Sequence, residues 1–292
     1  MQDHLRHMML FRTLVDAGTL TAAAEQLGLS KSVLSQHLKV LEQALGVQLL
    51  QRTTRKQVLT PAGQEFYRRC CEIERQVDSA WQTARDNQQG LSGPIRITAP
   101  YALMDAVVAP AIAALVAQHP EIQPDLIAED KQLNLLEQRI DLAIRVGESP
   151  DSSLRQRKLG EFSDVLAACE GYLQSRPALT RDSAGEHDFI RNAWQGQTSE
   201  LNLSNGTESH TIQLRASRSA NNLNAVLALA RAGAGLAYIP GFILEREAGL
   251  TEAMAGFSSS AVNVYALHPY QPLPKLVQHS IDGIEQQLQT LT

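Results

Sequence analysis

The sequence predicts a multidomain chain in which a small, all-α-dominated N-terminal part precedes an α/β body. Residues 3–89 carry apolar side chains at helical spacing, interrupted by one short basic stretch. A segment containing glycine and proline at residues 89–94 then marks a hinge. Beyond it, short apolar strands alternate with helical patterns, which favours an α/β fold over residues 91–292.

Three short helices are expected before residue 46. The first spans about residues 3–16, and Thr19 is a suitable N-cap for the second, which holds three consecutive alanines that allow another helix to approach closely. Gly28 permits a sharp turn, and Ser30 is expected to cap the third helix at residues 31–44. That helix has one apolar face, formed by Leu34, Leu38, Leu41 and Leu45.

The other side of the third helix carries small polar and basic side chains. Gln pairs bidentately with adenine in the major groove, and Ser or Lys reaches base edges or phosphates. The basic run at residues 51–56 suits a wing that grips phosphate oxygens. A solvated helix face that binds nothing is the alternative, but the order of these elements favours a winged helix-turn-helix that binds double-stranded DNA. The candidate DNA-contacting residues are Thr19, Lys31, Ser32, Ser35, Gln36, Lys39, Arg52, Thr53, Arg55 and Lys56.

A long linker helix is expected from Pro61 to about residue 89, because Thr60 is a good cap and proline suits the first helical position. Its narrow apolar seam has charged flanks, which favours pairing with one partner helix, although packing against the chain's own body is the alternative. We therefore expect a homodimer through residues 61–90 that reads a partly palindromic promoter site. The seam consists of Phe66, Cys70, Ile73, Val77, Ala80 and Ala84.

The body after the hinge is predicted as alternating strands and helices around a largely parallel sheet. The expected strands are residues 95–98, 124–128, 140–145, 164–168, 212–215, 236–239 and 262–267. The expected helices are residues 103–118, 133–138, 221–232 and 273–291.

Ligands in such sheets lie beyond the carboxyl ends of the strands, against helix N-termini. Arg145 would suit a carboxylate, and an ion pair between domains or at the surface is the alternative for it. Tyr101 could instead flank an aromatic or apolar molecule. The candidate effector-binding residues are Ala99, Pro100, Tyr101, Arg145, Val146, Ser219, Ala220 and Asn221.

Charge is unevenly divided along the chain. Residues 1–90 hold 11 Lys and Arg against 9 Asp and Glu, whereas residues 91–292 hold 15 against 22. A DNA-binding patch on an acidic protein is compatible with this balance. Cys70, Cys71 and Cys169 do not make a disulfide framework or a metal site, so we expect ordinary packing or exposed thiols, with a redox switch as the alternative.

No apolar run approaches the ~20 residues of a membrane span, and the N-terminus lacks an apolar signal core. We therefore expect no membrane association and a cytoplasmic location, with the protein on the nucleoid when bound to DNA.

A long pattern of residues runs through the N-terminal segment: Leu10-Phe11, Ala17-Gly18-Thr19-Leu20-Thr21-Ala22-Ala23-Ala24, Leu27, Ser30, Ser35, Leu41-Glu42, Leu45-Gly46, Leu49, Arg52, Thr60 and Ala62-Gly63. On these residues the segment closely resembles the DNA-binding domain of LysR-type transcriptional regulators. Leu50 stands where that family usually has Phe, and it keeps an apolar side chain at this position.

The body is similar to the effector domain of the same family, in the large branch with a DLAIRxG segment. The resemblance implies two periplasmic-binding-protein-like subdomains with a cleft between them, at residues 91–163 with 265–292 and at residues 164–264. It also implies dimers that often form homotetramers. Many members place Ser or Thr near the end of the first strand for an anionic inducer, whereas this chain has Ala99-Pro100. The resembling segments are 93–100, 141–147, 151–154 and 233–240.

Three classes of protein compete for this sequence. A transcription factor with a small-molecule effector is favoured, with RNA polymerase as a candidate partner. A solute receptor would need a signal peptide, and an enzyme should show a nucleophile elbow, a metal cluster or a phosphate loop, none of which the sequence contains. We therefore expect no catalytic residues, no metal and no cofactor. The third class is an architectural DNA binder with an unused body.

Overall fold

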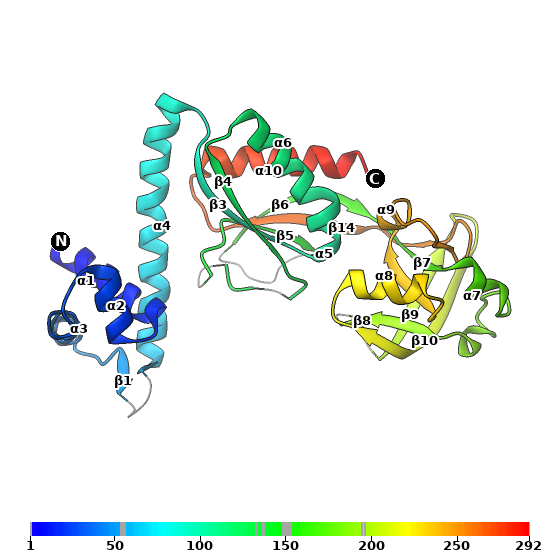
Figure 1. Ribbon diagram of the computed structural model, residues 1–292, viewed down its shortest axis with the longest axis horizontal. Coiled ribbons are helices and arrows are strands. Elements are labelled where there is room, and N and C mark those ends of the chain that lie inside the picture. Colours follow the sequence, from blue (N-terminus) through cyan, green and yellow to red (C-terminus); the bar gives the residue numbers. More distant parts are fainter. Residues whose placement is uncertain are drawn as a thin grey trace. The chain divides into compact units, whose positions relative to one another are not determined.

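The computed structural model describes residues 2–52, 57–131, 133–135, 138–147, 154–193, 195 and 197–291. The chain divides into two compact units, one built mainly from residues 1–88 and the other mainly from residues 89–292 (Figure 1). The first is helical and ends in a long helix, and the second is an α/β unit with two mixed sheets. The predicted fold class is confirmed.

Three helices form the body of the first unit: α1 (Gln2–Ala17), α2 (Leu20–Leu27) and α3 (Lys31–Leu45). The predicted caps are present, because the Ala22 N–H donates to Thr19 Oγ1 at 3.1 Å and the Val33 N–H donates to Ser30 Oγ at 3.2 Å. Gly28 ends α2 in the left-handed conformation, with φ of 62°. These local contacts set the turn between α2 and α3.

The core of this unit is formed by apolar side chains from all three helices and from the segment that follows them. Glu42 joins α3 to that segment, since its Oε1 accepts the backbone N–H groups of Leu49 at 2.8 Å and Leu50 at 3.2 Å. The wing strands β1 (Leu50–Arg52) and β2 (Gln57–Leu59) pair antiparallel. The largest buried core side chains include Phe11, Leu14, Leu34, Leu38, Leu41, Leu49 and Leu50.

Helix α4 (Pro61–Gln89) begins as predicted, with Thr60 Oγ1 accepting the Gly63 N–H at 2.9 Å. Its apolar seam does not face a single partner. Phe66 packs against Phe11 with ring centroids 5.5 Å apart, and Cys70 is fully buried in the core of its own unit. The alternative, packing against other parts of the same chain, therefore holds for the first half of the seam. The short helices α1–α3 do not close their own core, and the apolar side of α4 completes it.

The second half of the seam is open. Val77 is 40% exposed and Trp81 is 65% exposed within this single chain. Ala84 belongs to the residues whose side chains the structure does not describe. The apolar surface left free on α4 is thus shorter than the seam that the sequence predicts.

A network of charged and polar groups fastens α4 to α1. Arg12 is almost fully buried and pairs with Asp16 at 2.8 Å and with Glu74 on α4. The Tyr67 hydroxyl donates to Asp16 Oδ1 at 2.5 Å. Burial raises the pKa of Tyr67, and its hydrogen bond to Asp16 adds to that rise.

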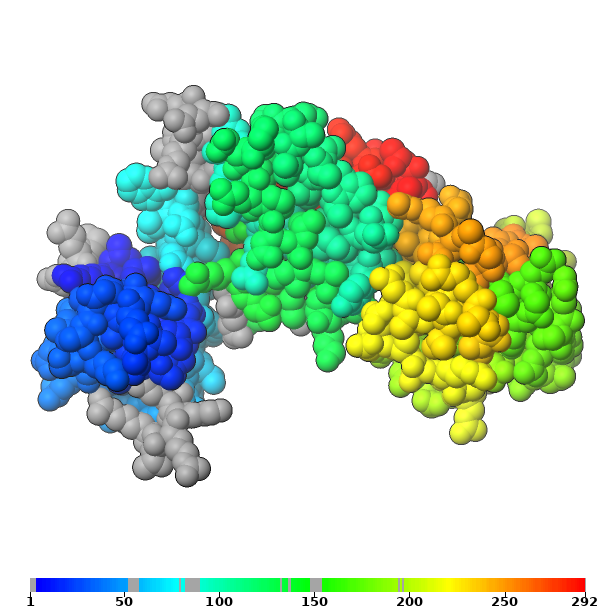
Figure 2. Space-filling model, in the orientation of Figure 1, coloured from blue at the N-terminus to red at the C-terminus, as the bar shows by residue number. Residues whose placement is uncertain are grey.

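The second unit contains a five-stranded sheet in the order β4-β3-β5-β14-β6. Strands β3 (Gly93–Ala99), β4 (Ile122–Ala128) and β5 (Leu142–Val146) run parallel to one another. Strand β14 (Val262–His268) pairs antiparallel with β5 and with β6 (Arg155–Phe162), so β6 runs in the same direction as β3. Helices α6 (Ala109–Gln118) and α10 (Lys275–Gln289) lie side by side on this sheet (Figures 1 and 2).

The helical stretch that was expected at residues 103–118 has three parts. A short helix α5 (Tyr101–Leu103) and a π-helical turn (Met104–Val108) precede α6. Pro110 explains the interruption, because it has no N–H to bond the turn before it. Tyr101–Gln118 also meets the length and composition of a membrane span, so the sequence-based statement that no run approaches that length is wrong. The stretch instead contributes core side chains, among them Leu103, Val107, Val108 and Ile112.

The second sheet has seven strands in the order β12-β7-β11-β8-β10-β9-β13. Strands β10 and β11 run parallel to β8, whereas β7 runs antiparallel to β11. Helix α8 packs on β8, β10 and β11 (Figure 1). The strands are β7 (Asp164–Ala168), β8 (Phe189–Asn192), β9 (Thr198–Ser204), β10 (Ser209–Ala220), β11 (Leu236–Pro240), β12 (Thr251–Glu252) and β13 (Ser258–Ser259); the helices are α7 (Glu170–Gln174), α8 (Leu223–Arg231) and α9 (Gly241–Leu244), with a 3₁₀ turn at Ala184–Glu186.

Three expectations about the body are wrong. The sheets are mixed rather than largely parallel, because each contains antiparallel pairs. In the five-stranded sheet β14 runs antiparallel to β6, and in the seven-stranded sheet β7 runs antiparallel to β11. The helix expected at residues 133–138 is absent from the described residues 133–135 and 138. Strands β6, β8 and β9 were not predicted, since their polar residues mask the apolar alternation on which strand prediction depends.

The cysteines take packing roles in the first unit. Cys70 and Cys71 are both buried, and burial raises the pKa of Cys70 to about 12. Burial also raises the pKa of Cys71. A buried thiol that stays protonated is a poor nucleophile, so these positions behave as small core residues rather than as a redox switch.

Candidate functional site

The polar face of α3 is the candidate surface for nucleic acid. Leu34, Leu38 and Leu41 are buried, whereas the predicted contact residues lie on the other side of the helix. Lys31, Ser32, Ser35, Gln36 and Lys39 recur at spacings of one, three, one and three residues, which keeps them on one side of the helix. All are exposed except Ser35, which is half-buried.

Two serines and a threonine near this face also have structural roles. Ser32 Oγ lies 2.9 Å from Oγ of Ser30, the cap of α3. Thr19 is exposed and caps α2, so its hydroxyl oxygen already accepts one backbone N–H. Each hydroxyl keeps further hydrogen-bonding capacity for a second partner.

The predicted wing contacts are described only in part. Thr53, Arg55 and Lys56 lie outside the described residues, and only the backbone of Arg52 is described, in β1. Val33, which the sequence analysis did not single out, lies on α3 beside the polar face and is 42% exposed. An exposed apolar side chain on such a helix has the chemistry for the methyl group of thymine, and only the structure shows that it is exposed.

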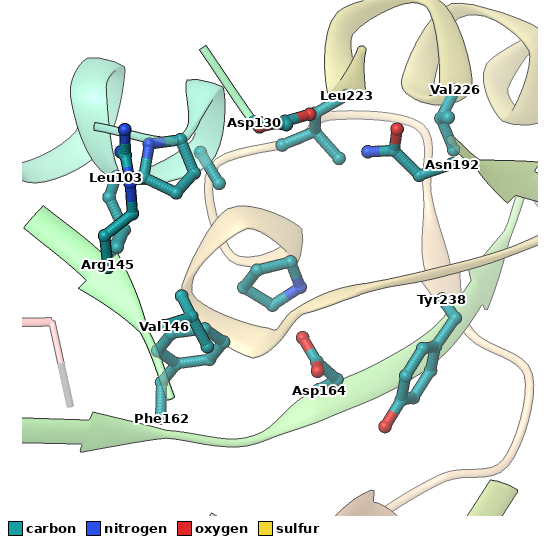
Figure 3. A pocket seen from close by; sticks show the side chains of 13 residues that line it. Leu103, Asp130, Arg145, Val146, Phe162, Asp164, Asn192, Leu223, Val226 and Tyr238 are labelled. Atoms are coloured by element: carbon teal, nitrogen blue, oxygen red, sulfur yellow. The ribbon is translucent and has the colours of Figure 1, made fainter. Parts of the chain in front are cut away.

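The second unit contains a cavity at the ends of strands from both of its sheets. The carboxyl ends of β3, β4, β5 and β6 meet at one edge of the five-stranded sheet, and β8 and β11 end at the facing edge of the other. Between them lies a cavity of about 280 Å³ (Figure 3). Its lining is Pro100, Ala102, Leu103, Asp130, Arg145, Val146, Phe162, Asp164, Asn192, Leu223, Val226, Tyr238 and Pro240.

Arg145 is held in the wall of the cavity. It is buried, and its guanidinium donates to the Ile144 carbonyl at 3.0 Å and to Thr98 Oγ1 at 3.2 Å. Burial lowers the pKa of Arg145 to about 10, and the charges of Asp130 and Glu129 oppose that change. Its positive charge is therefore already faced by carboxylates of the protein.

Two carboxylates also line the cavity. Burial raises the pKa of Asp130, against the effect of the Tyr101 N–H, which donates to its Oδ1 at 3.2 Å. Asp130 Oδ2 is buried without a hydrogen-bond partner among the described residues. Asp164, at the start of β7, is only 8% exposed, and burial alone raises its pKa to about 6.

The structure brings some of the predicted ligand residues together. Pro100, Arg145 and Val146 line the cavity. Ala99 is buried within β3, and the Tyr101 N–H positions Asp130. Ser219, Ala220 and Asn221 are not among the lining residues, because α8 begins at Leu223, two residues later than expected, and presents Leu223 and Val226 instead.

The remaining lining residues were missed for identifiable reasons. Asp130 follows the end of β4, so the rule for strand ends could have found it. Asn192 ends β8, a strand that was not predicted. Asp164 begins an antiparallel strand, and the rule for parallel strands gives no signal there. Within the described residues, no group of three or more His, Cys, Asp or Glu is placed to hold a metal ion.

Comparison with known proteins agrees with this architecture. Residues 5–64 match the model of the bacterial regulatory helix-turn-helix protein, lysR family. Residues 88–289 match the LysR substrate binding domain. The chain belongs to the LysR family of transcriptional regulators. This LysR-type regulator is a DNA-binding protein with a domain for a small-molecule effector, and its family is one of regulators rather than enzymes.

Relatives of this LysR-type regulator match it over nearly its whole length. It is 35% identical to the HTH-type transcriptional regulator PtxR of Pseudomonas aeruginosa, over 98% of this chain and 93% of that protein. It resembles the full-length structure of the Vibrio cholerae virulence activator AphB with a TM-score of 0.60 and 28% identity, over 96% of this chain and 98% of that one. A TM-score of 0.73 to ArgP from Mycobacterium tuberculosis, at 19% identity over 98% and 97% of the two chains, shows the fold alone.

Proposed function

We propose that this LysR-type regulator reads a specific promoter sequence with the polar face of α3 and changes its activity when a small molecule enters the cavity of the second unit. The observation that carries the proposal for DNA is the exposed face of α3, opposite a buried leucine face. Ser32, Ser35 and Gln36 have the chemistry for base edges, and Lys31 and Lys39 have the chemistry for phosphates. Thr19 and the wing residues 52–56 would grip the flanking backbone.

The assembly is part of the same proposal. A homodimer through residues 61–90, joined further into a tetramer, would present two recognition helices to a partly palindromic site. The open apolar positions Val77 and Trp81 support this pairing. RNA polymerase is a candidate further partner, and the cytoplasm is the expected location because the promoter is there.

The domain division supports a link between cavity and DNA. We assign residues 1–60 to DNA binding, 61–90 to the linker and 91–292 to the effector domain, in the DLAIRxG branch. The chain passes between the two sheets after Phe162 and again after Ser259. A molecule held beside these crossings would favour one arrangement of the sheets, which is the differential binding that regulation requires.

Base and phosphate contacts are separable by experiment. We expect Gln36→Ala to lose discrimination at one base pair, worth about 1–3 kcal/mol, while dimerisation is kept. Lys39→Ala and Arg55→Ala should weaken all duplexes about equally and reduce the salt slope by about 1 each. Fluorescence anisotropy with promoter and scrambled duplexes at several salt concentrations measures both effects.

A matched control is Gln26→Ala, which removes the same exposed side chain from α2. An unchanged binding profile for all the variants of α3 and the wing would reject the proposed surface. Footprinting with and without candidate metabolites separates a sensor from an architectural DNA binder, since only a sensor changes its footprint when a ligand is added.

A further inference from the structure

The carboxylate of Asp164 stands out among the polar groups of the cavity. Asp164 is only 8% exposed, yet among the described residues no hydrogen bond to its carboxylate oxygens is found. Only its backbone is engaged, since the Asp164 N–H donates to Ser259 Oγ at 2.9 Å. Its oxygens are not among the enclosed side-chain atoms that lack a partner, so they are open to the cavity that Asp164 lines. A carboxylate with so little contact with water is completed by a partner inside that cavity.

The carboxylate is directed into the cavity. It lies between Phe162 and Tyr238 and faces the open centre, with Asp130 and Leu223 on the opposite side (Figure 3). The aromatic side chains of Phe162 and Tyr238 lie on either side of it (Figure 3), and aromatic rings close to a bound cation are favourable. The rest of the wall is mainly apolar.

The charges of the cavity favour a cationic occupant. Arg145 is opposed by Asp130 and Glu129, and its guanidinium already donates to two oxygens of the protein. Asp164 has no such counter-charge, because desolvation is the whole cause of the change in its pKa. An ionised ligand carboxylate would therefore be repelled by the unpaired negative charge of Asp164. An ammonium group would supply the counter-charge that Asp164 lacks.

Building on the proposed regulatory function, we infer that the molecule bound in this cavity is a small amine, whose ammonium group pairs with Asp164 and whose apolar body contacts Phe162, Leu223 and Val226. The cavity of about 280 Å³ equals the liquid volume of about nine water molecules, so the body is the size of one ring or a short alkyl chain. Simple carboxylates are excluded by the same charge.

The test uses the full-length protein and matched probes. Benzylamine, benzyl alcohol and benzoate share one ring and differ in the polar group, and cyclohexylmethylamine, cyclohexylmethanol and cyclohexanecarboxylate form a second set. We expect the amines to raise the melting temperature and to bind in calorimetry, and the carboxylates to do neither. Asp164→Asn should weaken amine binding at least about tenfold, which corresponds to about 1.4 kcal/mol. Asp182→Asn, an exposed carboxylate of the same unit, should leave it unchanged.

A second measurement needs no ligand. Asp164→Asn should melt at a higher temperature than the unaltered protein, because it removes an unpaired buried charge, whereas loss of a carboxylate with a structural role would lower the melting temperature. This result also shows that the variant folds, so its loss of amine binding is interpretable.

Three results would overturn the inference: carboxylates that bind as well as amines, amine binding that Asp164→Asn does not weaken, or a panel in which no amine binds. Promoter binding is measured in parallel. A protein that binds its promoter but ignores the amines contradicts this inference alone. A protein that binds amines through Asp164 but retains no DNA contradicts the proposed regulatory function instead.

Discussion

At the scale of single residues, Asp164 couples ligand binding to stability. Its folded-state pKa of about 6 is above the ordinary 3.8, so the folded chain holds this proton more tightly than the unfolded chain does. The ionised carboxylate therefore lowers stability, and this loss is absent below the unfolded pKa of 3.8 and complete above about pH 6. A binding residue that reduces the stability of the empty protein is the expected trade-off at a functional site.

We expect Asp164→Asn to raise the free energy of unfolding by about 1–3 kcal/mol near neutral pH, because each pKa unit of the change is worth about 1.4 kcal/mol. The gain should shrink as the pH falls from about 6 towards 4. Urea unfolding at several pH values measures it, with Asp182→Asn as the control. A gain that is the same at every pH would contradict the assignment to the ionised carboxylate.

Gly63 acts by its lack of a side chain. A Cβ atom at this position would lie 2.0 Å from the backbone oxygen of Leu49, and a backbone atom cannot move aside cheaply. We expect Gly63→Ala to destabilise the first unit by about 2–3 kcal/mol or more and to reduce DNA binding with it. Thermal unfolding followed by circular dichroism measures this.

Gly283 is the matched control for that substitution. It lies inside α10, and apart from its chain neighbours and the nearby backbone of its own helix no atom lies within 4 Å of the place that a Cβ would take. Gly283→Ala should therefore stabilise the protein by about 0.5–1 kcal/mol, because alanine loses less backbone entropy in a helix. Equal effects of the two substitutions would mean that helix propensity, and not the contact with Leu49, decides the outcome at Gly63.

At the scale of elements, the join between α1 and α4 decides how the DNA-binding helices are carried. Arg12 is buried between Asp16 and Glu74, and Tyr67 donates to the same Asp16. Burial raises the pKa of Glu74, and the charge of Arg12 acts against that rise. Removing one member of such a network leaves the others buried without compensation.

We expect Arg12→Ala to lower the free energy of unfolding by about 3 kcal/mol, because Glu74 would lose its counter-charge and Asp16 would keep only its pair with Arg139. Tyr67→Phe should cost only about 1 kcal/mol, since it removes one hydrogen bond. Arg69→Ala is the control: its pairs with Glu65 and Glu72 are exposed and should contribute less than about 1 kcal/mol. Chemical denaturation measures these losses of unfolding free energy. An equal loss for Arg69→Ala and Arg12→Ala would show that the network does not hold the two helices together.

At the scale of the whole molecule, the free apolar surface of α4 and the acidic body have separate consequences. Residues 1–90 carry 11 basic against 9 acidic side chains, and residues 91–292 carry 15 against 22. DNA affinity must therefore come from a local surface rather than from net charge, and the pairing of two such surfaces would increase it through effective concentration.

We expect Val77→Glu to prevent dimerisation and to weaken binding to a two-half-site promoter by about 10²-fold or more, because a charge would enter the proposed apolar contact between two copies of α4. Analytical ultracentrifugation and anisotropy measure the two effects. Gln76→Glu adds the same charge on a neighbouring, exposed position and should change neither. A Val77→Glu protein that remains dimeric would place the contact between subunits elsewhere.

The sequence by itself determined the elements of the first unit, because their signals are local. Thr19, Ser30 and Thr60 act within three residues of the groups they cap, and the leucine face of α3 repeats within one helix. Because such signals are local, the family resemblance could be recognised from the sequence. For the same reason the sequence predicted Arg145 and Pro100 at the ends of strands. Helix periodicity and capping require only neighbours in the chain.

Only the tertiary structure decided which surfaces those elements use. The first half of the α4 seam is buried because Phe11, far away in the sequence, reaches Phe66. Strand β6 depends on pairing with β14, about a hundred residues away, so its polar sequence gave no local signal. Strand β7 is apolar and was predicted, but its antiparallel pairing with β11 is decided only by the fold. Asp164 lines the cavity because the two sheets meet there, and the burial of an isolated carboxylate is a property of that meeting and not of its neighbours in the chain.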